Sequence, residues 1–290
     1  MRMIYLVLVH EGREQLDALV ERLAPEGSSD KVIIHADRRS KLWRSLRDHP
    51  PADAERVHVI KNPVKVRWGH RSLQSAIGLL INRAIDFDFD YAHLVSGADW
   101  PVASRQEILR DLQSAQPPLC YIDAECGREE DRMQGFRIDA RWLRPDPERE
   151  PLAFRLKPYI ERLSHWLDAR RRRLGDRSRP WGQWFKGETW WSLPKEALQV
   201  VAVELRKLNG SSRLVGTYIC EEHVIPTIIA TKFPDRVADY RRYIDWTNGG
   251  DSPRLLGRSD QQAIALSGAW FARKVSLAHD DFFLRLPPYS

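Results

Sequence analysis

An aspartate directly follows an apolar run in the segment "YAHLVSGADW" (residues 91–100). A carboxylate in that position, Asp99, can hold a metal ion, hold a substrate or cap a helix. The residues after it already explain a helix start, because Ser104 and Glu107 have the spacing of a capping box and Pro101 turns the chain out of the strand. The task of Asp99 therefore depends on the elements that position it.

Strand and helix patterns alternate through the first 125 residues. A continuous apolar run, typical of a strand buried on both faces of a parallel sheet, occupies residues 4–10, and further strands are expected over residues 31–37, 56–62 and 91–97. Between and after them, residues 13–24 and 70–85 repeat apolar side chains at helical spacing, and a further helix is expected near 104–114. The alternation predicts a doubly wound α/β fold, with a mostly parallel central sheet flanked by helices.

Polar and aromatic residues stand where these strands end. They are "VH" (9–10), "HAD" (35–37), "RWGH" (67–70) and "SGADW" (96–100). Because open α/β sheets bind ligands beyond the carboxyl ends of their strands, we expect a nucleotide in the mouth formed by these residues.

The second half of the sequence is less regular. Residues 127–155 are polar and rich in proline and arginine, which predicts an excursion from the fold, and residues 159–180 predict a basic helix. The remaining expected elements are a strand, turn and helix over 186–208, a helix over 221–233 interrupted by Pro226, a strand over 241–246, a helix over 259–268 and a segment facing the site over 270–275.

The composition limits the partners and the compartment. With 46 basic and 40 acidic residues, the net charge is +6, so the surface attracts anions. The three cysteines fit neither a disulfide framework nor a zinc motif, which favours a reducing compartment. The N-terminal apolar run is too short for a signal peptide or a membrane span. We expect a cytoplasmic protein without a nucleic-acid partner, with possible peripheral contact to the inner face of the membrane through 159–180.

Six blocks of the sequence occur in the order found in one enzyme family. They are "IIHADRRS" (33–40), "RWGHRSLQSAIGLLINRAI" (67–85), "YAHLVSGADWPVASRQEI" (91–108), "GETWWSL" (187–193), "CEEHVIPTII" (220–229) and "WFARKV" (270–275). The chain resembles the core-2/I-branching β-1,6-N-acetylglucosaminyltransferase and peptide O-xylosyltransferase family. The resemblance implies a glycosyltransferase with the GT-A fold, a UDP-sugar donor, inversion at the anomeric carbon and no metal. Animal members carry a membrane anchor and stem that this chain lacks, so a bacterial catalytic core is expected.

The resemblance also implies a domain organisation. We expect a single catalytic domain over residues 1–290. Residues 1–125 would form its nucleotide-binding half, 126–185 a basic, irregular excursion, and 186–290 the half that binds the acceptor and the diphosphate.

The lone Asp99 bears on the expected absence of a metal. Most GT-A enzymes carry Asp-x-Asp at the end of the fourth strand, where it holds Mn²⁺ or Mg²⁺, but here Asp99 has no second carboxylate two residues away. A literal Asp-x-Asp, Asp86 and Asp88, precedes the strand and so lies at the wrong end of the sheet for a nucleotide. We therefore expect no metal and no other cofactor.

Glu222 is the expected general base, because "CEEHVIPTII" resembles the family segment whose second acidic residue has that role. Inversion requires one such base, which takes the proton of the attacking hydroxyl. Pro226 excludes the carbonyl four residues back, that of Glu222, and so loosens the helix there. The alternatives are Glu221 as the base, or a glutamate that only complements the helix dipole.

Cations must replace the metal at the leaving diphosphate. The block "WFARKV" resembles the diphosphate-binding segment of the family and supplies Arg273 and Lys274, a bidentate fork and a compact point charge. Arg254 resembles a further phosphate ligand, although its spacing to the following helix differs from the family pattern.

The nucleoside is expected at the first strand ends. Asp37 resembles the family acid that accepts hydrogen bonds from the uracil or ribose, and Val9 and His10 would pack beside the base. Trp68 resembles an aromatic residue of the donor pocket, with a buried core tryptophan as the alternative. His35 is expected to be a packed strand residue.

The sugars are expected near the remaining aromatic and acidic residues. Asp99 and Trp100 would contact the donor sugar or the acceptor, together with Glu188, Trp190 and Trp191. Strand alternation allows only one of the two adjacent tryptophans to face the site.

These residues predict an inverting, metal-independent transfer of N-acetylglucosamine or xylose from a UDP-sugar to a hydroxyl of a glycan or other acceptor. Two alternatives stay open. One is a catalytically inactive protein of the same fold that binds a carbohydrate or nucleotide. The other is a metal-dependent GT-A transferase that uses Asp86 and Asp88.

Overall fold

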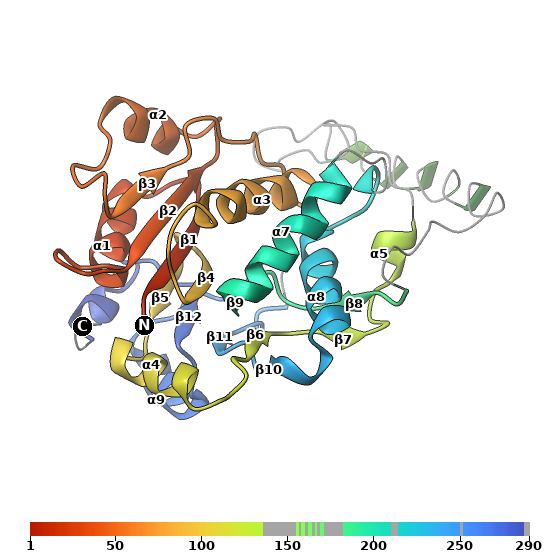
Figure 1. The fold of residues 1–290 in the computed structure, drawn as a ribbon. Helices are drawn as coiled ribbons and strands as arrows, with labels where there is room; N and C mark the ends of the chain where they lie inside the picture. The colour runs from red at the N-terminus through yellow and green to blue at the C-terminus, as the bar shows by residue number, and fades with distance from the viewer. Residues whose placement is uncertain are drawn as a thin grey trace.

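The computed structural model describes residues 1–135, 182–209, 214–249 and 252–286, with isolated helical positions between 155 and 170. Within this part of the chain the main sheet has seven strands in the order β10-β6-β9-β4-β1-β2-β3 (Figure 1). Their bounds are β1 (Met3–Val9), β2 (Lys31–Ala36), β3 (Val57–Val59), β4 (Tyr91–Ser96), β6 (Cys120–Ile122), β9 (Trp191–Pro194) and β10 (Val237–Ala238). Neighbouring strands are parallel except at β9, which is antiparallel to both β4 and β6.

Burial explains why the central strands form. All residues of β1 and β4 are buried, and so are those of β2 after its first residue, as is typical of strands covered on both faces. Alternate residues of β1 enter two different cores, with Ile4 and Leu6 in one and Tyr5 and Val7 in the other. The four predicted strands are therefore confirmed, although β3 is shorter than expected.

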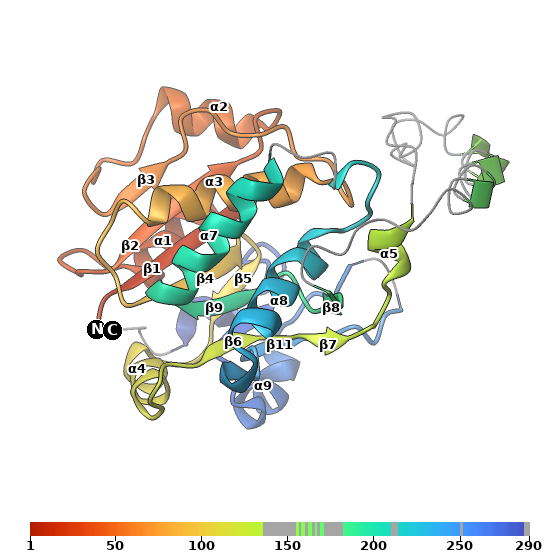
Figure 2. The same ribbon diagram turned by 45° about the vertical axis from the view of Figure 1, so that its right-hand side comes forward.

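Helices cover both faces of the sheet. Their bounds are α1 (Arg13–Leu23), α2 (Lys41–Asp48), α3 (Ser72–Ala84), α4 (Arg105–Gln113), α5 (Asp131–Gln134), α7 (Lys195–Asn209), α8 (Glu221–Lys232) and α9 (Gln261–Ser267), with short 3₁₀ turns at Pro234–Arg236, Arg258–Asp260 and Asp281–Arg285. The core that contains Ile4 also holds buried residues of α3, α7 and α8, and these helices lie side by side (Figures 1 and 2). Residues of α1, α2 and α4 belong to the core on the other face.

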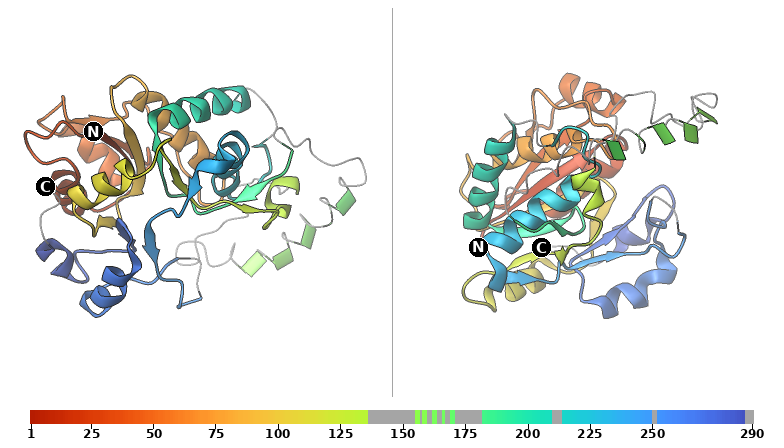
Figure 3. Two further views of the ribbon diagram at one scale, coloured as in Figure 1. Left: turned by 60° about the horizontal axis from the view of Figure 1, so that its bottom comes forward. Right: turned by 90° about the vertical axis from the view of Figure 1, so that its right-hand side faces the viewer.

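A smaller sheet packs into that second core. It contains β11 (Arg242–Ile244), β12 (Phe271–Arg273) and β5 (Asp99–Pro101) in that order, and it lies with α9 to one side of the main sheet (Figure 3). β12 is antiparallel to β5, which pairs Arg273 with Asp99. A two-stranded pair joins β7 (Glu125–Cys126) to β8 (Phe185–Lys186). The pairing of β12 with β5 brings a C-terminal segment next to the residues that follow β4.

The expected fold class is confirmed: the protein is mixed α/β with a mostly parallel central sheet. The Ser104–Glu107 capping box is present at α4. The pattern did not predict α2, which is capped by the Ser40 side chain accepting from the Trp43 amide. In the described residues no helix is long and apolar enough to span a membrane. The expected excursion and the basic segment 159–180 lie largely outside the described residues.

Candidate active site

The strand order gathers the expected site residues at one edge of the main sheet. The carboxyl ends of β1, β2, β4 and β6 meet there, and the antiparallel β9 contributes its amino end. Asp37, Asp99 and Asp123 follow β2, β4 and β6, while Trp190 precedes β9. This edge is where an open α/β sheet binds its ligand.

Asp99 is the buried counter-ion of Arg273. Only 1 % of the aspartate is exposed, and its Oδ1 lies 2.9 Å from Nη1 of Arg273. Its Oδ2 accepts the amide of Ser96 at 2.5 Å, and the Ser96 hydroxyl accepts from Arg273. Both carboxylate oxygens are thus engaged within the protein. The expectation that Asp99 contacts a sugar directly is corrected, because the side chain has neither the exposure nor an unengaged oxygen for it.

Arg273 also contacts Trp190. Its guanidinium carbon lies 4.5 Å from the centroid of the indole, within the range of a cation–π contact. Trp190 is 8 % exposed and belongs to the core that contains Ile4, so its expected contact with a sugar stays a prediction. Trp191 is completely buried and pairs with Leu94 and Ile122 of the neighbouring strands. It is a core residue, so its expected contact with the sugar is wrong.

Trp100 is also a core residue. It is 1 % exposed, and its indole N–H donates to the Phe283 carbonyl at 3.0 Å. The expected contact of Trp100 with donor sugar or acceptor is therefore wrong as well, because β5 turns this ring into the core between the sheets.

Lys274 follows Arg273 and has no such counter-ion in the part of the chain that the structure describes. Among the described residues, its ammonium has no hydrogen-bond or ion-pair partner, although its backbone pairs with Leu256 and Arg254. Arg254 differs, since its guanidinium bridges Asp245 and Asp260, each at 2.6 Å. A phosphate would compete with two carboxylates for Arg254, so its phosphate-binding role stays a prediction.

Glu222 lies in the first turn of α8, with 19 % of its side chain exposed. Its Oε2 is 2.9 Å from Nη1 of Arg132 and 3.5 Å from Nζ of Lys186. Burial raises the pKa of Glu222, and the positive charges of Lys186 and Arg132 oppose that shift. The alternative base, Glu221, is 4 % exposed and belongs to the interior side of the helix.

Pro226 acts as expected on the carbonyl of Glu222, but it does not interrupt the helix. α8 runs unbroken from Glu221 to Lys232. Proline has no N–H, so the Glu222 carbonyl lacks its helical donor. The amide of Gly187 supplies one at 2.8 Å. A loop from the β8 side is thereby attached to the turn that carries the candidate base.

Glu188 lies close to Glu222, and Asp123 lies close to Glu188. Burial raises the pKa of Glu188, and the negative charges of Glu222 and Asp123 raise it further. Burial also raises the pKa of Asp123, whose carboxylate accepts the amide of Glu188. Near both, burial and the charges of Glu188 and Asp123 raise the pKa of Tyr240 to about 12. Glu222, Glu188, Asp123 and Tyr240 therefore form a cluster of proton-binding groups near one edge of the main sheet.

Sequence reasoning missed Asp123, Lys186 and Arg132. Asp123 could have been found, because "CYID" (120–123) is an acid directly after a short apolar strand. Lys186 and Arg132 carried no comparable signal, since an isolated cation in a basic chain is usually a surface charge.

The nucleoside end is only partly assembled from the expected residues. The amide of Asp37 donates to the Val9 carbonyl at 3.0 Å, and the Asp37 carboxylate pairs with Arg39 at 3.1 Å. His10 is exposed beside Glu11. Trp68 is 57 % exposed, which makes the buried-core alternative wrong, and its ring meets that of Tyr218.

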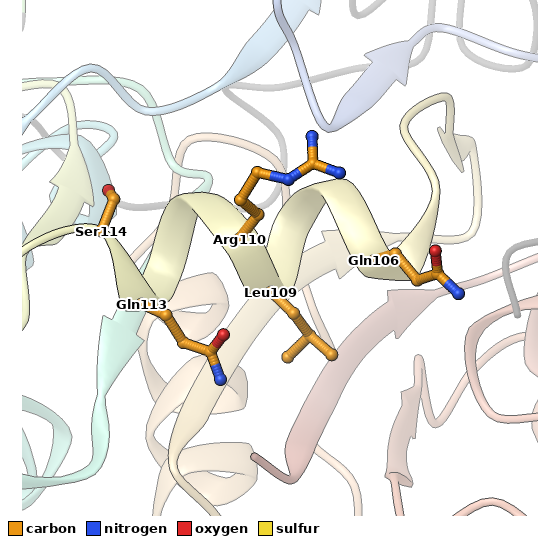
Figure 4. Close-up of a pocket in the computed structure, with 5 residues that line it drawn as sticks. All are labelled: Gln106, Leu109, Arg110, Gln113 and Ser114. Carbon is orange, nitrogen blue, oxygen red and sulfur yellow. The ribbon is translucent and has the colours of Figure 1, made fainter.

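Asp86 and Asp88 lie at the opposite edge of the sheet, as predicted. Asp88 pairs with Lys195 at 3.0 Å and with Arg2 before β1. Among the described residues, no group of three or more His, Cys, Asp or Glu side chains could hold a metal ion. A surface hollow along α4 is lined by Gln106, Leu109, Arg110, Gln113 and Ser114 and includes none of the site residues (Figure 4).

Comparison with known proteins decides the family. The model of the Core-2/I-Branching enzyme family matches residues 3–264, which is most of the chain. The chain belongs to the Core-2/I-Branching enzyme family. Membership makes it a glycosyltransferase, and it confirms the family that the six sequence blocks resemble. No curated protein sequence matches the chain.

Solved structures similar to this Core-2/I-Branching family member include a synthase and a geranyltransferase. A 4-diphosphocytidyl-2C-methyl-D-erythritol synthase from Anaerococcus prevotii is 11 % identical, with a TM-score of 0.37 over 82 % of this chain and 87 % of its own. A mannose-1-phosphate geranyltransferase from Thermus thermophilus is 12 % identical, with a TM-score of 0.36 over 82 % of this chain and 73 % of its own.

Proposed function

We propose that the protein is an inverting glycosyltransferase that moves a sugar, N-acetylglucosamine or xylose, from a UDP-sugar to a hydroxyl of a glycan or other acceptor. The observation that carries the proposal is the position of Glu222. This carboxyl group is partly exposed near the sheet edge where we expect the ligand, and it is paired with Arg132 and Lys186. Family membership supplies the reaction class.

The reaction needs one proton acceptor. The acceptor oxygen attacks the anomeric carbon while its proton passes to Glu222, and the bond from that carbon to the diphosphate oxygen breaks. UDP leaves with the bonding electron pair. A base with a raised pKa suits this step, because it binds the proton of the attacking hydroxyl more readily than an ordinary glutamate does.

The leaving UDP gains negative charge, which Arg273 and Lys274 would stabilise. Asp99 neutralises Arg273 and, with Trp190, fixes its position. The uncompensated charge therefore comes from Lys274, which supports Lys274 as the main phosphate ligand. Asp37 and Trp68 would bind the nucleoside.

Metal independence is supported by the contacts of Asp99. The carboxylate that follows β4 is already bound by a guanidinium and a backbone amide. A divalent cation would have to displace Arg273 from it. Lys274 and Arg273 would supply the positive charge instead.

The test is a panel of UDP-sugars, with release of UDP measured in EDTA with and without acceptor. Acceptor-dependent release in EDTA supports the proposal. Binding of UDP without any release supports the inactive alternative, and activity that requires added Mn²⁺ supports the metal-dependent one. In the active case, Glu222→Gln should lower kcat by roughly 10²- to 10⁴-fold while UDP still binds.

A further inference from the structure

The residues just before α8 contact both ends of the site. The amide of Tyr218 donates to the Arg132 carbonyl at 2.9 Å, and the Arg132 guanidinium carbon lies 5.9 Å from the centroid of the Tyr218 ring. The same ring also meets Trp68 edge-on, with 5.7 Å between centroids and 82° between planes. One aromatic ring thus joins the expected nucleoside residue Trp68 to the arginine that pairs with Glu222.

A second connection runs through the backbone. The amide of Ile219 donates to the Gly69 carbonyl at 3.0 Å, and the Ile219 carbonyl accepts from the amide of Glu222 at 3.2 Å. Ile219 has a φ of 50°, a left-handed conformation that β-branched residues rarely adopt. Such a conformation persists only where the surrounding contacts over-determine it. The junction between the loop at Gly69 and the helix of Glu222 is therefore held firmly.

We propose that Tyr218 is a positioning residue for the general base: its ring holds the Arg132 guanidinium on Glu222 and couples that ion pair to the loop at Trp68. The inference rests on the proposed role of Glu222. Tyr218 acts through Arg132 and needs no contact with substrate. Occupation of the nucleoside end would then help to fix the base before the acceptor reacts.

The charges around Glu222 determine what loss of the ring does. Arg132 and Lys186 stabilise its ionised form, whereas Glu129 lies against both cations and the neighbouring Glu188 carries a like charge. A guanidinium 2.9 Å from the carboxylate is the nearest of these groups. If Arg132 moves away, the ionised form loses its closest partner. The acidic limb of the kcat/KM profile reports that change, because it follows the base of the free enzyme.

The experiment compares Tyr218→Leu with Tyr218→Phe, which keeps the ring. For Tyr218→Leu, the acidic limb of kcat/KM should move upward by about 0.5 to 1 pH unit. A close opposite charge typically lowers the pKa of a carboxyl group by about one unit or more, and the leucine variant should lose part of that effect. Tyr218→Phe should keep the wild-type limb. An unmoved limb in the leucine variant, or an equal shift in both variants, overturns the proposal.

A double-mutant cycle tests whether Tyr218 acts through Arg132. Arg132→Gln should move the limb upward by itself, and Tyr218→Leu should add no further shift in that background. Additive shifts of the acidic limb would contradict the proposal that Tyr218 acts through Arg132. Should Tyr218→Leu not fold, Trp68→Ala removes the contact between Trp68 and the Tyr218 ring from an exposed position. Its limb should move in the same direction, and an unmoved limb would contradict the coupling to the nucleoside loop.

Glu222→Gln separates this inference from the proposed function. Near-normal activity in that variant would refute both the proposed role of Glu222 and the positioning role of Tyr218. Loss of activity in Glu222→Gln, with wild-type pH profiles in the Tyr218 and Trp68 variants, would refute only the positioning role of Tyr218.

Discussion

The amide of Gly187 donates to the carbonyl of Glu222 at 2.8 Å, and Pro226 explains why that carbonyl is available. The proline removes one helical donor, and a loop from outside the helix replaces it. Only glycine fits, because a Cβ at Gly187 would lie 1.8 Å from the Asp123 carbonyl oxygen. The backbone of the candidate base is thus attached to the loop that carries Glu188 and to the end of β6.

Gly187→Ala tests this attachment. The added methyl group must displace the backbone at Asp123, which should cost about 1 to 3 kcal/mol of unfolding free energy. Displacing the first turn of α8 should also lower kcat by about 10- to 100-fold. Chemical denaturation and steady-state kinetics measure the two effects.

The matched control is Gly78→Ala in α3, where the new methyl group meets nothing within 4 Å. Alanine is the better helix former, so this variant should gain up to about 1 kcal/mol and keep its kcat. Equal effects of the two substitutions would show that the close contact at Gly187 has no special importance.

Asp99→Asn tests the buried ion pair. It leaves Arg273 without its counter-ion, and breaking a buried pair should lower the free energy of unfolding by about 3 kcal/mol. Asp88→Asn breaks an exposed pair at the far edge and should cost less than about 1 kcal/mol without changing activity. Similar losses in the two variants, measured by urea unfolding, would contradict the role given to Asp99. Loss of activity in Asp88→Asn would instead favour the metal-dependent alternative.

The strands, their ends and most helices were predictable from the sequence, because two-sided burial and helical spacing depend on the types of neighbouring residues. The six sequence blocks predicted the family. The partner of Asp99 was not predictable in this way, since Arg273 lies 174 residues away and the register of β12 against β5 brings them together. The burial of Trp100 was not predicted, for a related reason. Trp68 stands on a loop and Trp100 on a strand, and tertiary packing alone decides which of them reaches solvent.

The two tryptophans should therefore respond in opposite ways. Trp100→Ala removes a fully buried ring and should lower the free energy of unfolding by about 3 to 5 kcal/mol. Trp68→Ala removes a mostly exposed ring, so its stability should change by no more than about 0.5 kcal/mol while UDP binds less tightly. Thermal unfolding and calorimetric titration with UDP measure these quantities. Unchanged UDP affinity in Trp68→Ala would remove this residue from the nucleoside end.

Lys274→Ala should weaken UDP binding roughly 10- to 100-fold, because a hydrogen bond to a charged group contributes about 1.5 to 3 kcal/mol. Lys274→Arg keeps the charge and should recover part of the affinity. Lys207→Ala, at the exposed end of α7, is the control for loss of one positive charge and should bind UDP normally. If Lys207→Ala weakens binding as much as Lys274→Ala does, the effect is one of net charge, and the contact with the diphosphate is refuted.

The pH dependence of kcat/KM should follow Glu222. The base is active when deprotonated, so the rate should fall as the pH falls through the pKa of Glu222, which burial places above its ordinary 4.5. Lys186→Met removes a charge that favours the ionised carboxylate, and the acidic limb should move upward by about 1 pH unit. Lys195→Met removes a lysine that pairs with Asp88 at the far edge, and its limb should stay in place. A limb that does not move in Lys186→Met, or that moves downward, would mean that the rate-limiting ionisation belongs to another group of the cluster.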